Sequence, residues 1–277
     1  MNTKVYKLKA LTNLHVGSSN LSYGIIDKLV QRDSVSRFPV IHASSMKGSL
    51  KEYCENFDIE DKEKLQTYIE QVFGSNNQSG ENKFFSSHLL SIPVRSNVKP
   101  FFRATCPAII IQLMESLSAF GFGAELIESF NKLLNTLIKL RNSSSMDFVL
   151  FQSKIDYMII EDWSKQGNIL TFEFDSILTS WLGDQKDFVL LNDSVFMEIC
   201  ENLPIIARNN LSDNRNLWYE ELVPRQSEFW FFHIYPNIDV IEDIINQQTP
   251  VQIGANASVG DGYCVINTLN TISYEKS

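Results

Sequence analysis

The apolar residues follow two different periods along the chain, and the changes of period predict a succession of strands and helices. Residues 5–14 alternate between polar and apolar side chains, which predicts a half-buried strand that runs into a turn at 15–18. A long loop extends from there to about Phe38. Residues 39–42 then predict a short extended segment that leads into the first helix.

Two helices are predicted after this segment. From Met46 to Phe57 the apolar residues recur every three or four positions, so Ser44 or Ser45 is the expected N-cap. A second apolar stripe follows Asp58, which we expect to cap a helix that stops at Gly74. The small, polar residues that follow from this glycine predict a mobile loop.

The rest of the chain mixes both periods. Aromatic and branched residues at 84–105 predict one or two strands, and Pro107 suits the first turn of a helix. The segment 203–234 is apolar on either side of a polar centre at 208–216, which predicts a long β-hairpin with an exposed tip. The other expected elements are a helix around 126–138, strands at 148–160 and 169–174, short helices at 175–182, 194–202 and 238–247, and a last strand ending at Ile266. This succession predicts an α+β protein with one domain and insertions.

Composition and charge narrow the class of protein. The formal net charge of −9 over 277 residues argues against a surface coated by nucleic acid, so any such contact must be a local groove. The four cysteines form no CxxC pair and are far apart, which fits reduced thiols in an intracellular protein. No apolar run approaches the roughly 20 residues needed to cross a bilayer. We therefore expect a globular, cytoplasmic protein that does not contact membranes.

The start of the helix at 46–57 contains two residues that folding alone does not explain. The charge of Lys47 opposes the helix dipole, and Gly48 is roughly 1 kcal/mol less favourable than alanine inside a helix. A bound phosphate would explain both, because free N–H groups and a lysine hold anions at a helix N-terminus and glycine allows close approach. A surface lysine in a slightly poor helix explains them equally well.

Three other stretches carry candidate chemistry. Asp27 follows two branched apolar residues in a loop, and it is either a turn-former or a placed acid. The run 218–221 offers two aromatic rings for base stacking and two carboxylates, although it also reads as a half-buried strand. The glycine-rich segment 254–262 suits a phosphate-binding loop or only a hairpin turn, and it lacks the context of a dinucleotide site. The four histidines are too scattered for a zinc site.

Five stretches, taken in order, resemble the backbone RAMP-superfamily subunit of type III-B CRISPR (Cmr) effector complexes, and they span nearly the whole chain. The stretches are HVGSSNLSYGIIDKLVQRD, FPVIHASSMKGSLKEYC, IPVRS…TCPAIII, LPIIARNNL…LWYEELVP and QIGANASVGDGYC. The resemblance implies a modified ferredoxin-like (RRM-type) palm, with inserted helical fingers at about 18–38 and 57–105 and a β-hairpin thumb at about 203–234. All three would belong to a single RAMP domain that covers residues 1–277.

The resemblance also implies a function and partners. Copies of the protein would form a filament along a CRISPR guide RNA, next to other Cmr subunits, and would cut the complementary target RNA at regular intervals. The activity would be that of an endoribonuclease that depends on Mg²⁺ or Mn²⁺, with the 2′-hydroxyl of the target as the nucleophile. Two alternatives remain open: a guide-binding scaffold without catalysis, and an endoribonuclease that matures the guide.

Site residues follow from the same resemblance. Asp27 matches the loop aspartate required for target cleavage and would be the metal ligand, while His15, Glu220 and Glu221 match nearby residues with supporting catalytic roles. The residues that would contact guide or target RNA are Arg32, Ser44, Ser45, Lys47, Gly48, Gly254, Gly260 and Gly262.

Overall fold

The computed structural model describes residues 1–18, 25–141, 148–150, 158–161, 163–164, 168–169, 172–209 and 217–269. The chain divides into two compact units, and each combines helices with a sheet, which confirms the predicted α+β class. The first unit contains residues 1–89 and 201–268, and the second contains residues 90–200 and 269–277. The strand β6 (Ser87–Val94) begins in the first unit and ends in the second.

The first unit carries all of the candidate site residues. Its helices are α1 (Ala43–Glu55), α2 (Lys62–Phe73) and α7 (Val240–Asn246). Besides the start of β6, its strands are β1 (Asn2–Ala10), β2 (Val40–Ile41), β3 (Gly74–Ser75), β4 (Gln78–Ser79), β5 (Lys83–Phe84), β13 (Ile205–Asn209), β14 (Leu217–Glu221), β15 (Glu228–Tyr235), β16 (Val251–Gln252) and β17 (Tyr263–Thr268).

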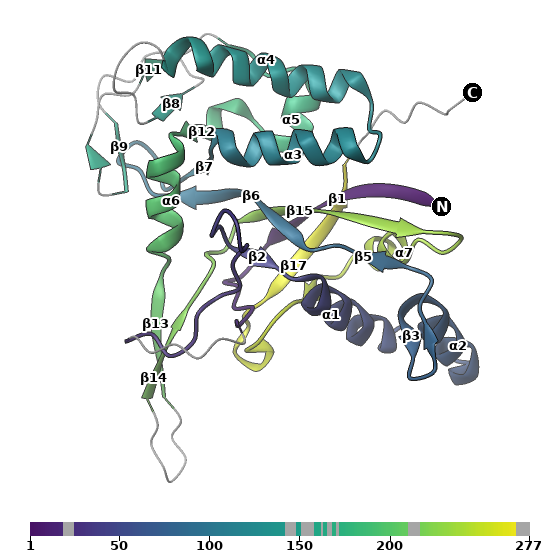
Figure 1. Ribbon diagram of the computed structural model, residues 1–277. Coiled ribbons are helices and arrows are strands. Elements are labelled where there is room, and N and C mark those ends of the chain that lie inside the picture. The colour runs from purple at the N-terminus through teal and green to yellow at the C-terminus, as the bar shows by residue number, and fades with distance from the viewer. Residues whose placement is uncertain are drawn as a thin grey trace. The chain divides into compact units, whose positions relative to one another are not determined.

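The strand β1 is the centre of the sheet in this unit. It pairs antiparallel with β15 on one side and with β17 on the other (Figure 1). Tyr6, Leu8 and Ala10 of β1 are buried on one face, as the alternation at 5–14 predicted, although Val5 on the other face is buried too and the strand ends at Ala10. Every residue of β15 except Ile234 is buried, so this strand has the nearly continuous apolar sequence of a strand covered on both faces.

The strands of the second unit pair in both parallel and antiparallel directions. Its strand β7 (Phe102–Thr105) pairs antiparallel with the end of β6 and parallel with β12 (Phe188–Leu191). Its helices are α3 (Pro107–Ala119), α4 (Ala124–Arg141), α5 (Ser176–Leu182) and α6 (Asp193–Glu201), of which α3 begins at the predicted proline. Its remaining described strands are β8 (Phe148–Leu150), β9 (Ile159–Ile160), β10 (Trp163–Ser164) and β11 (Asn168–Ile169).

The predicted hairpin at 203–234 was too long. Only β13 and β14 form it, with Ile205 opposite Glu221. Residues 208 and 209 of the predicted polar centre belong to β13, and residues 210–216 lie outside the described residues. The chain turns after Glu221, where Leu14 bridges to Val223 and Gln226 donates its N–H to the Ala10 carbonyl. The apolar run that follows becomes β15 because a strand with two buried faces belongs inside a sheet.

Two predicted helix starts were also wrong. The N-cap of α1 is His42, and Ser44 and Ser45 lie in the first turn, because Gln31 Oε1 accepts the His42 N–H at 2.8 Å and replaces a local cap. The N-cap of α2 is Asp61 rather than Asp58, since its carboxylate accepts two backbone N–H groups of the first turn at 3.1 Å.

The polar segment that follows α2 is a two-stranded hairpin, β3 and β4, where we predicted a mobile loop. All four cysteines are free and buried, as expected of reduced thiols. None of the helices in the described part of the chain is long and apolar enough to cross a membrane. The boundaries of fingers and thumb stay a prediction.

Candidate functional site

The fully buried carboxylate of Glu220, on β14, is the centre of the candidate site. It accepts four hydrogen bonds: from Lys28 Nζ at 2.8 Å, Arg208 Nε at 2.6 Å, Trp218 Nε1 at 2.7 Å and Asn256 Nδ2 at 2.8 Å. Burial raises the pKa of Glu220, but these hydrogen bonds outweigh it and hold the pKa at about 2, below its ordinary value of 4.5. The carboxylate is therefore ionised at neutral pH.

These four donors occupy all of the hydrogen-bond acceptor sites of the carboxylate, which has about four lone pairs. They come from three separate segments: the loop before β2, the hairpin β13–β14 and the glycine-rich loop between β16 and β17. Arg208 also pairs with Asp261 of the glycine-rich loop. The arrangement suits a residue that positions these segments relative to one another.

Glu221, the next residue on β14, is also buried and paired. Its carboxylate accepts the Val30 N–H at 3.0 Å and contacts the guanidinium of Arg32. The Arg32 side chain is only 11% exposed and also donates to the Arg37 carbonyl at 3.0 Å. Within this chain, Arg32 thus holds the loop against β14, and little of its side chain is open to an RNA phosphate.

Asp27 lies beside the same strand but is exposed. Its backbone N–H donates to the Tyr219 carbonyl at 3.1 Å, and its Oδ2 accepts the Tyr219 N–H at 2.8 Å. Lys28 extends this pairing, because it bridges in parallel to Glu220. The hydrogen bonds fix the loop to β14 while one face of the Asp27 carboxylate remains open to a ligand.

His15 connects β14 to the glycine-rich loop from the buried side. Its Nδ1 donates to the Glu221 carbonyl at 2.7 Å, because a carbonyl oxygen only accepts, and its own carbonyl accepts the Ala255 N–H at 2.9 Å. His15 is only 2% exposed. Its position supports the loop rather than direct contact with a substrate.

The backbone conformation of the glycine-rich loop explains two of its glycines. Gly254 and Gly262 have positive φ angles, and a Cβ atom on either would lie 2.4 Å or 2.3 Å from a backbone carbonyl oxygen. Gly260 also has a positive φ of 85°, but the space where its Cβ would lie is open. The shape of the loop therefore requires glycine at 254 and 262 whether or not RNA binds there.

The start of α1 is held by side chains from outside the helix. Its N-cap residue, His42, forms no side-chain cap and its first turn has no acidic residue, but Ser86 Oγ accepts the Ala43 N–H at 3.1 Å. Gln31 holds it in place: its Nε2 donates to Ser45 Oγ at 3.0 Å, while Ser44 is exposed. Gly48 is exposed as well, and a Cβ there would meet nothing within 4 Å. Packing therefore does not require a glycine at this position.

The substitution Gly48→Ala tests this point. Alanine is about 1 kcal/mol more favourable than glycine in an exposed helix, so we expect urea denaturation to give a free energy of unfolding higher by up to that amount. If the glycine serves RNA binding, affinity for guide RNA falls about fivefold or more in the same variant. The neighbouring Ser49→Ala serves as control. A more stable variant with undiminished RNA affinity would remove Gly48 from the site.

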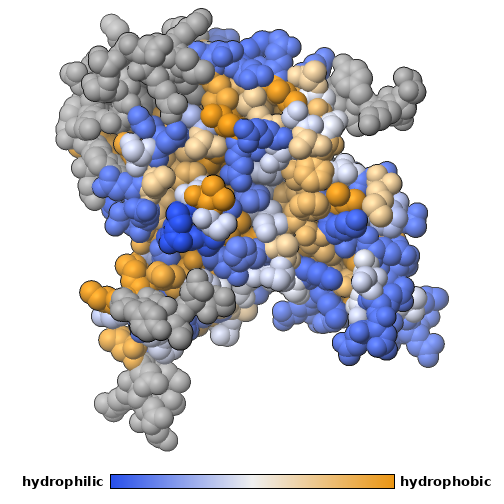
Figure 2. Space-filling model, viewed as in Figure 1, coloured by the Kyte–Doolittle hydropathy of each residue, from blue (hydrophilic) through white to orange (hydrophobic). Residues whose placement is uncertain are grey.

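Apolar side chains are exposed on one face of the hairpin β13–β14 (Figure 2). Leu217 is 59% exposed, Ile205 48% and Tyr219 38%. Trp218 is less available, because its ring lies 4.8 Å from Lys28 Nζ and its N–H is bonded to Glu220. Of the predicted aromatic pair, Tyr219 is the ring that is open to stacking.

Sequence reasoning missed two members of the cluster. Asn256 carried no signal, because its left-handed conformation (φ 68°) and its bond to Glu220 both depend on the folded loop. Arg208 was expected only as part of the hairpin, although it contacts both Glu220 and Asp261.

Few side chains of the candidate site could bind a metal ion. No group of three or more His, Cys, Asp or Glu side chains that could hold an ion occurs in the part of the chain that the structure describes. Glu220 and Glu221 are occupied by cationic side chains, which leaves Asp27. A hydrated Mg²⁺ or Mn²⁺ fits this site only with one protein carboxylate and with phosphates of bound RNA as further ligands.

The family model of the RAMP superfamily matches residues 7–265 of this chain. The chain belongs to the RAMP superfamily. This RAMP protein is 25% identical to the "CRISPR system Cmr endoribonuclease Cmr4" of Pyrococcus furiosus, with 92% of each chain covered. It is 26% identical to the "CRISPR system CMR subunit Cmr4" of Saccharolobus solfataricus, with 96% of each covered. The expected resemblance to Cmr subunits is confirmed.

Solved structures show the same fold. A chain of the type III-B Cmr-beta complex bound to cognate target RNA matches with a TM-score of 0.77 and 20% identity, over 97% of this RAMP protein and 98% of that chain. Oligomeric Cmr4 from Pyrococcus furiosus matches with a TM-score of 0.66 and 19% identity, over 98% and 100%. The predicted RAMP-type fold is therefore confirmed.

Proposed function

We propose that this RAMP protein is a backbone subunit of a type III-B CRISPR ribonucleoprotein, which binds guide RNA and cleaves complementary target RNA. The observation that carries the proposal is the open carboxylate of Asp27, bonded to β14 beside the buried Glu220 cluster. The two Cmr4 relatives support the assignment, and one of them is named an endoribonuclease. The match to oligomeric Cmr4 supports a filament of several copies, and the match to a chain of the Cmr-beta complex supports other Cmr subunits as neighbours.

The chemistry is transfer of a phosphoryl group within the target strand. The 2′-hydroxyl oxygen forms a bond to the adjacent phosphorus, the bond to the 5′-oxygen breaks, and the proton lost by the 2′-hydroxyl is balanced by one gained at the 5′-oxygen. Asp27 would lie at the attacked phosphate, and the Glu220 cluster would hold its loop in place. A divalent ion bound to Asp27 would supply positive charge at that phosphate.

Sequence specificity would come from base pairing with the guide. Protein contacts to sugar and phosphate carry no sequence information, so the start of α1 and the glycine-rich loop would bind the guide backbone for any sequence. The net charge of −9 is compatible with this role, because a few cations in one groove are sufficient. In this arrangement Ser44, Ser45, Lys47 and Gly48 contact the guide, and Asp27 acts on the target.

Reconstitution tests the proposed function. The protein is combined with guide RNA, the other Cmr subunits and a labelled complementary target, and the products are separated by size. We expect a ladder of fragments at a constant interval. A target that is bound but uncut would favour the scaffold alternative, and cutting of repeat RNA by the isolated protein would favour guide maturation.

Dependence on metal is a separate prediction. Addition of EDTA in excess over the divalent ions should abolish the ladder, and Mg²⁺ or Mn²⁺ in excess over the chelator should restore it. The reason is that the carboxylate of Asp27 is negatively charged, so it cannot by itself stabilise the negative charge of the attacked phosphate. Guide affinity, measured in the same samples, should change little. Undiminished cutting in EDTA would remove the ion from the mechanism and leave Asp27 to act by itself.

A further inference from the structure

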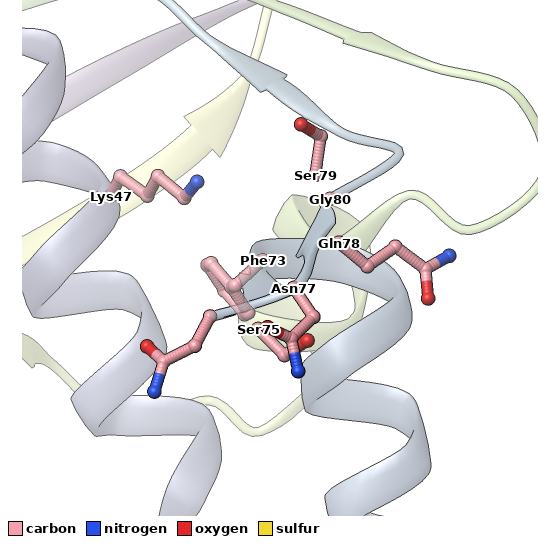
Figure 3. Close-up of a pocket in the computed structure, with 8 residues that line it drawn as sticks. Lys47, Phe73, Ser75, Asn77, Gln78, Ser79 and Gly80 are labelled. Carbon is pink, nitrogen blue, oxygen red and sulfur yellow. The ribbon is translucent and has the colours of Figure 1, made fainter.

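A polar hollow of about 490 Å³ lies between α1 and the hairpin β3–β4, inside the first unit. Figure 3 shows Lys47 extending from α1 toward the hairpin that carries Asn77 and Ser79. The volume is within the range of small-ligand sites, about 300–1,000 Å³. The residues that line it are Lys47, Phe73, Ser75, Asn76, Asn77, Gln78, Ser79 and Gly80.

The hairpin has a fixed base. Gly74 and Gly80 cross so closely that a Cβ on Gly80 would lie 2.4 Å from the Val72 carbonyl oxygen, and one on Gly74 would lie 2.6 Å from the Gly80 nitrogen. The strands pair from Gly74 opposite Ser79 to Ser75 opposite Gln78. These contacts fix the base of the hairpin to the end of α2, and its polar residues 75–79 are exposed.

The chemistry of the lining combines one cation with neutral donors and acceptors. Among the residues that the structure describes, Lys47 forms no ion pair. Serine hydroxyls and asparagine or glutamine amides line most of the rest, and Phe73 is the only apolar residue. A site for a free phosphate would have more cations or converging N–H groups. One cation next to neutral polar groups matches a sugar joined to a phosphate.

We propose that this hollow is a subsite for one ribose–phosphate unit of the RNA backbone, with Lys47 on the phosphate and the hairpin side chains on the 2′-hydroxyl. The inference rests on the proposed function, since it presumes that guide RNA crosses the start of α1. It adds the hairpin as the element that distinguishes RNA from DNA. A 2′-hydroxyl is both donor and acceptor, and amide and hydroxyl side chains match both roles.

A pair of charge variants tests the location. Ser79→Asp places a negative charge in the hollow, and Thr67→Asp places the same charge on the exposed surface of α2, away from it. We expect Ser79→Asp to weaken guide RNA binding by the full chain about tenfold or more, and Thr67→Asp to change it less than about twofold. Equal effects of the two variants would overturn the subsite. So would a changed oligomeric state with unchanged RNA affinity, which would assign the hollow to contact between copies.

The recognition of ribose needs its own measurement. The unmodified protein and the double variant Asn77→Ala, Ser79→Ala are each titrated with guide RNA and with its 2′-deoxy analogue. We expect the affinity lost on removal of the 2′-hydroxyls to be several-fold smaller in the double variant, and an equal loss in both proteins would overturn the role of the hairpin. If the unmodified protein binds no guide RNA, the proposed function itself fails, and the subsite fails with it.

Discussion

Target cleavage falls about 10²–10⁴-fold when Asp27 is replaced by asparagine, while the complex still binds guide and target. Asparagine is the sharpest substitution, because its amide oxygen can still accept the Tyr219 N–H that holds the loop to β14. The variant therefore removes the charge of the side chain and leaves the backbone pairing of the loop intact. The measurement is the rate of ladder formation under single-turnover conditions, with binding of target followed in parallel.

A matched control separates this effect from the loss of any surface charge. Asp58 is also exposed and belongs to the same unit, between α1 and α2, so Asp58→Asn removes one negative charge far from β14 in the sequence. We expect this variant to cleave at the unmodified rate. Full activity of the Asp27→Asn complex would exclude the carboxylate from the reaction and would support the scaffold alternative.

The residues around Asp27 show how far sequence reasoning reaches. The alternation in β1 and the period of α1 were sufficient to place both elements, because each buries one face and that face is visible in the pattern. The end of the hairpin at Glu221 was not visible. Apolar residues continue into β15, and a pattern cannot tell a hairpin strand from a strand buried on both faces.

Tertiary contacts decided the details that the sequence could not. The serines expected to cap α1 do not do so, because the helix begins after His42, whose N–H is accepted by the side chain of Gln31, eleven residues earlier. Likewise, the partners of Glu220 lie at positions 28, 208, 218 and 256, and only the pairing of β14 with its neighbours brings them together. Family resemblance supplied the candidate residues, whereas the structure distinguishes the open carboxylate of Asp27 from the enclosed one of Glu220.

The second large effect concerns stability. Replacement of Glu220 by glutamine should lower the free energy of unfolding by about 3–5 kcal/mol, the usual cost of breaking a buried ion pair on one side. Each carboxylate oxygen accepts two donors in the native protein, Lys28 and Trp218 on one, Arg208 and Asn256 on the other. Whichever way the glutamine amide turns, its NH₂ group must face donors. Urea denaturation measures the loss, and Glu60→Gln at an exposed position is the control.

The pH dependence of this loss identifies its cause. Because the pKa of Glu220 is about 2 in the folded protein and its ordinary value is 4.5, its contribution is complete above about pH 5 and disappears as the pH falls toward 2. The shift corresponds to about 3 kcal/mol. The difference in stability between the unmodified protein and Glu220→Gln should therefore shrink as the pH is lowered from 5 toward 3. A difference that stays constant over this range would mean that packing, and not the ionised carboxylate, holds the loops together.

The same variant tests the link between the cluster and catalysis. If Glu220 acts only by positioning the loop that carries Asp27, cleavage by the folded Glu220→Gln complex at neutral pH should be reduced without a change in its dependence on Mg²⁺ concentration. Had Glu220 been a ligand of the ion, the concentration of Mg²⁺ needed for half-maximal cleavage would rise as well. The fourfold bonding of the carboxylate and its lowered pKa favour the positioning role, since a ligand would first have to release the cationic side chains that surround it.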